Sequence, residues 1–177
     1  MLNSTIMKVA ITLILIGYVS YTTFKSITLF ITYKKSLPNF LETHKDAELY
    51  TDSPLWWIVT SLLSILSLVM AVVTQMYPTD QAYYFTLAYV AIAIIFVGLA
   101  FETYVRKRVY LTDDGIYYVG KVYRYRMMVN FEAKKSFIKN ICILMNDKEK
   151  IEVSKKMGLK IKEAHDLWKK NKKEKRR

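Results

Sequence analysis

Few residues in this chain could carry chemistry. Its 177 residues include two histidines and one cysteine. His44 stands between Glu42 and Asp46, with Glu48 and Asp52 nearby, and histidine and carboxylate side chains are common metal ligands. A lone histidine among solvated acids in a polar segment is the favoured interpretation, so we expect no metal site there.

The other candidates also favour structural roles. His165 stands one residue off an apolar helical stripe, so we expect it at the edge of that stripe. Cys142 lies in the run 141–144, which is typical of a buried strand where cysteine acts as a small hydrophobic residue. A single cysteine cannot form an intramolecular disulfide or a thiolate zinc site. An enzyme needs groups that converge, so we expect a non-catalytic protein without a cofactor.

Charge divides the chain into two regions. Hydrophobic residues make up 53% of it and charged residues 24%. Residues 103–177 nevertheless hold twenty-two of the 27 Lys and Arg and nine of the 15 Asp and Glu. This asymmetry predicts a transmembrane domain over residues 1–105, a basic domain over residues 106–170 and a basic tail over 171–177.

Three apolar segments predict membrane-spanning helices, at about 9–33, 55–77 and 82–104. At about 1.5 Å per residue, each is long enough for a hydrocarbon core of about 30 Å. Lys25 is the only charge in the first segment, and its side chain can reach the headgroups. The alternative is a buried, ion-pairing lysine in a transport path. We expect residues 34–54 to form a cytoplasmic loop.

Small residues recur along the second and third segments at helical spacing. In lipid, such residues let helices approach closely. They predict a helix-packing seam formed by Thr60, Ser64, Ser67, Ala71, Thr74, Ala91 and Gly98. Spacing does not decide between packing within the chain and packing against a partner protein, and we favour the first.

Lys and Arg near the ends of the segments predict the orientation. Arg106, Lys107 and Arg108 follow the third segment directly, which favours a cytoplasmic C-terminus and an N-terminus outside the cell. The turn at 78–81 has no Lys or Arg, in keeping with an outside position. We therefore expect a multi-pass protein of the cell membrane.

The basic domain has short alternating segments typical of antiparallel strands. Strands are predicted at 109–111 and 116–119 around the turn Asp113–Gly115, over 123–131, at 137–138, at 141–145 and at 151–153. Ser154 is a candidate N-cap for an amphipathic helix. The apolar stripe of that helix comprises Met157, Ile161, Ala164 and Trp168, and we expect it to close one side of the sheet.

The run RVYLTDDGIYYVGKVYRY, the later ICILMNDKEKIEVS and the final helix resemble the bacterial pleckstrin-homology-like domains of small membrane proteins. The resemblance covers about residues 106–170. It implies an α+β fold, with an antiparallel sheet and one C-terminal helix, that acts in binding or scaffolding and has no catalytic residues. Some relatives are linked to antimicrobial-peptide resistance or bacteriocin self-protection.

The basic charge predicts a partner. A domain tethered below a bilayer is close to the anionic inner leaflet, and each nearby Lys or Arg contributes about 1 kcal/mol of attraction. We expect lipid rather than nucleic acid to be bound, through Arg106, Lys107, Arg108, Lys121, Arg124 and Arg126. The favoured function is an accessory or regulatory subunit of a bacterial cell-envelope complex, with a membrane-protein partner or a second copy. Alternatives are a bacteriocin or antimicrobial-peptide immunity protein, or a small transporter component.

Overall fold

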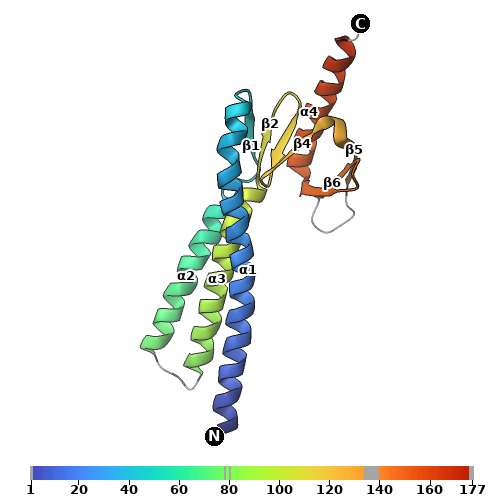
Figure 1. The fold of residues 1–177 in the computed structure, drawn as a ribbon. Helices are drawn as coiled ribbons and strands as arrows, with labels where there is room; N and C mark the ends of the chain where they lie inside the picture. The colour runs from blue at the N-terminus through green and yellow to red at the C-terminus, as the bar shows by residue number, and fades with distance from the viewer. Residues whose placement is uncertain (1, 78, 80, 134–139, 176–177) are drawn as a thin grey trace. The chain divides into compact units, whose positions relative to one another are not determined.

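The structure is a computed structural model that describes residues 2–77, 79, 81–133 and 140–175 (Figure 1). The chain forms two compact units. The helical unit comprises Met1–Ile31 and Pro54–Tyr104, and the sheet unit comprises Thr32–Ser53 and Val105–Arg177. Residues 32–53, predicted as part of the transmembrane domain, therefore cluster with the basic C-terminal region.

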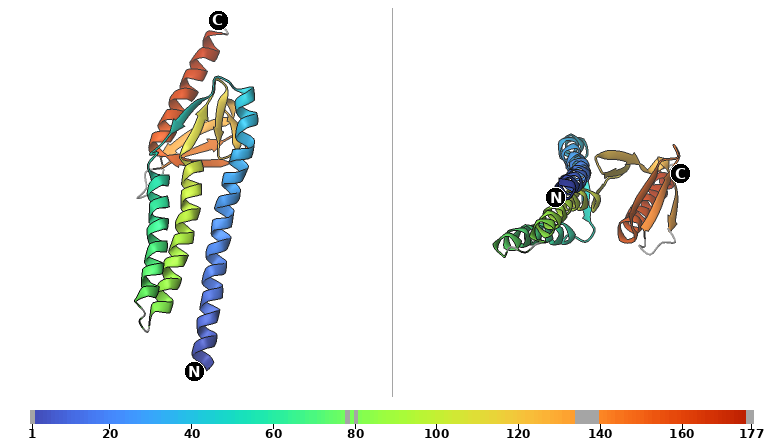
Figure 2. Two further views of the ribbon diagram at one scale, coloured as in Figure 1. Left: turned by 90° about the vertical axis from the view of Figure 1, so that its left-hand side faces the viewer. Right: turned by 90° about the horizontal axis from the view of Figure 1, so that it is seen from below.

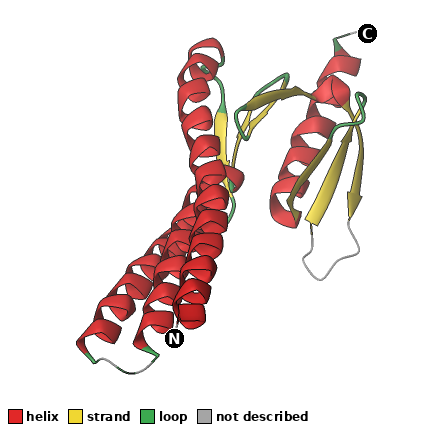
Figure 3. Cartoon of the chain, turned by 60° about the horizontal axis from the view of Figure 1, so that its bottom comes forward, coloured by secondary structure: helices red, strands yellow, loops and turns green. Residues whose placement is uncertain are grey.

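Three helices are long and apolar enough to cross a membrane (Figure 3). They are α1 (Leu2–Thr43), α2 (Trp56–Met76) and α3 (Ala82–Arg106). Only 11–17% of their most apolar windows is buried, so most of these side chains face outward. Exposing so many apolar side chains to water would be unfavourable. The three helices therefore indicate a membrane protein.

The described strands of the sheet unit form two antiparallel sheets (Figure 2). The first has the order β1-β2-β3-β4, and the second has the order β5-β6-β7. The strand bounds are β1 (Glu48–Thr51), β2 (Arg108–Leu111), β3 (Gly115–Tyr118), β4 (Lys121–Arg124), β5 (Met128–Ala133), β6 (Asn140–Met145) and β7 (Lys150–Ser154). Helix α4 (Lys155–Glu174) follows β7.

One hydrophobic cluster connects α4 with residues of both sheets. Met157 and Ile161 are fully buried in it, while Ala164 and Trp168 are partly buried against it. Gly158 lets α4 approach β6, because a Cβ atom there would lie 2.7 Å from Cβ of Ile141. The predicted apolar stripe of α4 therefore packs against the strands.

Ser154 caps α4 as predicted, since its hydroxyl accepts a hydrogen bond from the Met157 amide. In β6 the alternation buries Ile141 and Ile143 and leaves Cys142 half-buried on the other face. The run 141–144 therefore lies in a strand as predicted, but only alternate residues of that strand are buried. The strand predicted at 137–138 lies outside the described residues.

The single strand predicted over 123–131 is wrong. A 3-10 turn at Tyr125–Met127 separates β4 from β5, so the run contributes one strand to each sheet. Two backbone hydrogen bonds hold the turn, from the Tyr125 amide to Asp114 O at 3.0 Å and from the Asn146 amide to Met127 O at 2.8 Å. These bonds come from distant turns, so the local alternation could not show the break.

The loop predicted over 34–54 is also wrong. Helix α1 continues to Thr43 despite Pro38, and β1 follows it. Tyr33 and Phe40 lie on the same side of α1 and bury their rings against Tyr117 of β3. The Tyr117 hydroxyl contacts Ser36 Oγ at 2.7 Å. This aromatic packing stabilises the extension of the helix beyond the first apolar segment.

Candidate functional site: the basic surface and a groove beside α4

The six cations predicted to bind lipid lie at two places in the sheet unit. Arg106, Lys107 and Arg108 lie where α3 ends and β2 begins, whereas Lys121 and Arg124 lie on β4 and Arg126 on the following turn. Arg124 and Arg126 are exposed. Together with Val122, which is 53% exposed, they alternate along the chain with the buried residues Tyr123 and Tyr125. The exposed side of β4 and the following turn is therefore basic.

Lys121 and Lys107 each form an ion pair. Lys121 Nζ lies 3.0 Å from Glu149 Oε1, and both side chains are well exposed, so this pair contributes little to stability. The Tyr123 hydroxyl also donates to Glu149 Oε1, at 3.3 Å. Burial and then the Glu149 charge raise the pKa of Tyr123 to about 12.

Lys107 has a structural role that the sequence did not reveal. Its ammonium lies 3.4 Å from Oδ2 of Asp52, whose side chain is 5% exposed. The Asp52 amide donates to Lys107 O at 2.8 Å, which fixes the end of β1 beside β2. Burial alone would raise the pKa of Asp52, but the Ser154 hydroxyl, the Lys107 charge and the Ser53 hydroxyl outweigh it and hold that pKa below 3.8.

His165 is buried at 3% exposure, so its predicted place at the stripe edge is wrong. Its ring lies within 6.0 Å, centre to centre, of the rings of Tyr125, Phe131 and Trp168. Asp166 Oδ1 is 3.6 Å from His165 Nδ1, too far for a hydrogen bond, and neither ring nitrogen has a hydrogen-bond partner among the described residues. Burial lowers the pKa of His165, with Lys169 adding to the effect. A neutral, buried imidazole has no access to substrate.

His44 lies at the end of α1 rather than in an open loop. Its ring stacks on Phe40 with 4.5 Å between centres, and its Nδ1 lies 3.2 Å from Phe40 O. These contacts give His44 a packing role.

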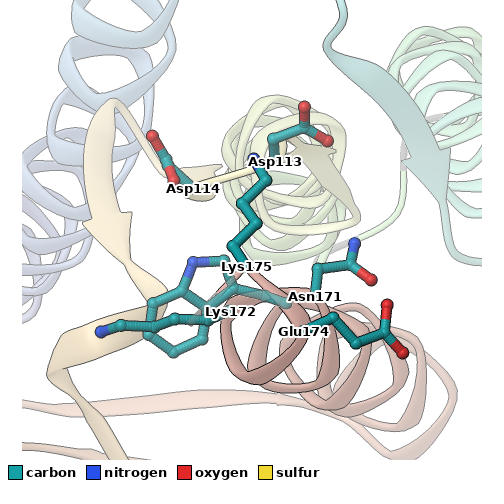
Figure 4. A pocket seen from close by; sticks show the side chains of 7 residues that line it. Asp113, Asp114, Asn171, Lys172, Glu174 and Lys175 are labelled. Atoms are coloured by element: carbon teal, nitrogen blue, oxygen red, sulfur yellow. The ribbon is translucent and has the colours of Figure 1, made fainter. Parts of the chain in front are cut away.

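A groove runs beside α4 in the sheet unit. A hollow of about 290 Å³ is bounded by the start of β1, the β2–β3 turn and the middle of α4. It joins a wider hollow of about 840 Å³ toward the end of α4, since both include Asp113, Trp168 and Asn171. Figure 4 shows the wider part, where Asp113 and Asp114 lie opposite Asn171 and Lys172, and Lys175 reaches toward the turn. No local sequence pattern indicates this groove, because β1 and α4 lie far apart along the chain.

The predicted packing seam is the least exposed face of α2. Thr60, Ser64 and Ala71 are buried, and Ser67 and Thr74 are partly buried. Ser64 Oγ donates to Ala93 O of α3 at 3.0 Å. Ala91 is 5% exposed, and a Cβ atom at Gly98 would lie 3.3 Å from Cα of Thr23 in α1. Ser64 and Gly98 therefore contact other helices of the chain.

Lys25 and Glu102 lie near the same ends of the helical unit. The Lys25 side chain is exposed, as expected for a lysine that reaches the headgroups. The Ser26 hydroxyl of α1 donates to Glu102 of α3 at 3.4 Å.

The chain was compared with known protein families, curated proteins and solved structures, and none of them matches. The resemblance to bacterial pleckstrin-homology-like domains thus depends on the quoted residues and the strand order alone.

Proposed function

We propose that the chain is a non-catalytic integral membrane protein that acts by binding, as an accessory or regulatory subunit of a bacterial cell-envelope complex. Its sheet unit lies against the anionic inner leaflet. The observation that carries this proposal is the combination of three apolar helices with a neighbouring region that holds twenty-two of the 27 Lys and Arg.

The fold of the sheet unit supports a binding role. Antiparallel strands followed by a C-terminal helix are in keeping with the pleckstrin-homology-like domain that residues 106–170 resemble, while β1 lies outside that range and the strands form two sheets. We propose that α4 closes this sheet pair, because Met157 and Ile161 belong to the cluster that the strands share. Two of its titratable groups have structural roles: His165 is buried, and Asp52 pairs with Lys107.

The orientation proposed is an N-terminus outside the cell and a C-terminus in the cytoplasm. Arg106, Lys107 and Arg108 support it, because positive residues next to a span are retained on the cytoplasmic side. A reporter protein fused after Arg177 tests it. Activity of a cytoplasmic reporter is expected, and activity only of a periplasmic or extracellular reporter contradicts the orientation.

Lipid apposition can be tested in the full chain. A headgroup-sensitive dye is attached to Val122→Cys in a Cys142→Ser background, and the protein is placed in nanodiscs of zwitterionic or one-third anionic lipid. We expect contact between dye and headgroups in anionic discs only, because exposed cations near such a surface each add about 1 kcal/mol. High salt should abolish this contact between dye and headgroups, because it screens the attraction.

Arg124→Gln with Arg126→Gln should reduce this contact, whereas Lys162→Gln with Lys170→Gln removes the same charge from α4 and serves as control. Equal contact in zwitterionic discs, or equal loss in both double variants, contradicts apposition through the β4 face.

A further inference from the structure

The narrow part of the groove beside α4 is acidic although the region around it is strongly basic. Among the described residues, the acids Asp46, Glu48, Asp113 and Glu163 line it together with one cation, Lys160. Lys160 is itself 3.6 Å from Glu163. Because the acids of this lining outnumber its cations, this surface attracts cations and repels anionic lipid.

The acidic wall is fixed in place by the fold. Glu48 begins β1 and pairs with Leu111 of β2. The Asp113 amide donates to Asp46 Oδ2 at 3.4 Å, which holds the segment before β1 against the β2–β3 turn. A surface that is ordered before binding loses less conformational entropy when a partner docks.

The opposite wall offers apolar contact. Leu167 is 61% exposed although it stands in the middle of α4. Trp168 is partly buried and lines both hollows. Lys172 Nζ already lies 4.9 Å from the centre of the Trp168 ring, so an ammonium group is accepted at this aromatic surface.

We propose that this groove docks a segment of a partner protein in which Lys or Arg residues are interspersed with apolar side chains. Cations of the segment pair with Glu48, Glu163 and Asp113, and its apolar side chains cover Leu167 and Trp168. The stretch of α4 that lines the groove, from Lys160 to Lys175, is about 22 Å long at 1.5 Å per residue. An extended segment of about seven residues has that length.

The basic end of a second copy fits less well. Residues 169–177 contain no apolar side chain that could cover Leu167, and α4 continues to Glu174. The inference rests on the proposed binding function and adds the class of partner to it, but it requires no contact with lipid.

Binding can be measured with the full-length protein in zwitterionic nanodiscs, which attract cationic peptides weakly. The probe is a fluorescein-labelled peptide of eight residues that alternates Lys and Leu. A Glu-Leu peptide tests the charge and a Lys-Ser peptide tests the apolar contact. Fluorescence anisotropy should report saturable binding of the Lys-Leu peptide alone, weakened at high salt.

Glu48→Gln with Glu163→Gln should weaken that binding about tenfold, because two rim charges are removed. Leu167→Ser should also weaken it. Glu132→Gln, at an exposed acid on β5, should bind as the parent does, and thermal melting of all variants should stay unchanged.

Several results would overturn the proposal: no saturable binding, equal binding of the Glu-Leu or Lys-Ser peptide, or equal affinity of the Glu48/Glu163 variant and the Glu132 control. Peptide-independent self-association that the Glu48/Glu163 variant abolishes would assign the groove to a second copy instead. If the dye did not contact lipid headgroups but the Lys-Leu peptide still bound, the result would contradict lipid apposition and leave the groove proposal intact.

Discussion

Asp52 connects three distant parts of the sheet unit. Its backbone follows β1, its carboxylate pairs with Lys107 at the start of β2, and the hydroxyl of Ser154, the N-cap of α4, helps to lower its pKa. A carboxylate buried to this degree is tolerated only because charged and hydroxyl donors satisfy it. Its loss should therefore loosen β1, β2 and α4 together.

Asp52→Asn keeps the shape of the side chain and removes its charge. We expect the free energy of unfolding at neutral pH to fall by about 1–3 kcal/mol, because the Asn side chain keeps one acceptor oxygen but loses the charge that pairs with Lys107 and turns its second acceptor into a donor. Denaturation of the full chain in detergent, followed by tryptophan fluorescence, measures this. Asp114→Asn, at an exposed turn residue, is the control.

The contribution of the Asp52 carboxylate to the free energy of unfolding should depend on pH. The folded-state pKa of Asp52 lies below its ordinary value of 3.8, so its stabilising effect is present above that value and disappears as the pH falls through the folded pKa. The gap between the parent and Asp52→Asn should thus be constant near neutrality and shrink below about pH 4. A gap independent of pH would contradict the role given to the carboxylate charge.

At the residue scale, sequence predicted helix contacts better than it predicted burial of polar groups. Met157 and Ile161 follow a helical period, so their burial was evident. His165 stands next to the stripe in sequence, but it packs against Trp168 of the stripe and against Tyr125 and Phe131, which lie outside α4. Asp52 could not be recognised, because Lys107 and Ser154 lie far away along the chain.

Helix α3 passes close to α1 at Gly98. An added Cβ would lie 3.2 Å from Thr23 Oγ1 and 3.3 Å from its Cα, and Thr23 Oγ1 donates to Ile94 O at 3.0 Å. In lipid, close backbone approach and interhelical hydrogen bonds hold helices together. Gly98 and Thr23 therefore form a contact that a large side chain must disturb.

Gly98→Leu should destabilise the helical unit by about 1–3 kcal/mol, because it overpacks this contact. Gly17 supplies a matched control in α1, since an added Cβ meets nothing within 4 Å there. Thermal unfolding in detergent should separate the two variants, with Gly17→Leu close to the parent. Equal stability of Gly98→Leu and Gly17→Leu would contradict the packing of α1 on α3.

At the element scale, long and strongly patterned segments were predictable and short pairings were not. The three apolar helices and α4 were located from length and period. Strand β1 is four residues long and pairs with β2, which begins more than fifty residues later. No local pattern reveals such a partner. The groove beside α4 could not be predicted for the same reason, because β1 and α4 are far apart in sequence.

At the scale of the whole molecule, the chain order does not follow the compact units. Two membrane-length helices, α2 and α3, are inserted between β1 and β2, the adjacent strands of one sheet. Because β1 pairs with β2, the first sheet of the basic region depends on residues that precede α2 in the chain. Charge composition alone placed the boundary at one point near residue 105 and could not show this interleaving.

The interleaving predicts how fragments of the chain behave. A fragment of residues 105–177 lacks β1, the carboxylate of Asp52 and the aromatic rings of Tyr33 and Phe40 that pack on Tyr117. Joining 32–53 to 105–177 through a short Gly-Ser linker restores them. The ends to be joined are adjacent, because the Asp52 amide donates to Lys107 O at 2.8 Å.

We expect the joined fragment to melt cooperatively and the shorter one to melt lower or without a sharp transition, because an edge strand and a buried aromatic face are missing from it. Circular dichroism of the two purified fragments measures this. Tyr117→Ala in the joined fragment should lower its melting temperature toward that of the shorter one. Equal melting of both fragments would show that the basic region folds without β1, and the units would then be separable along the chain.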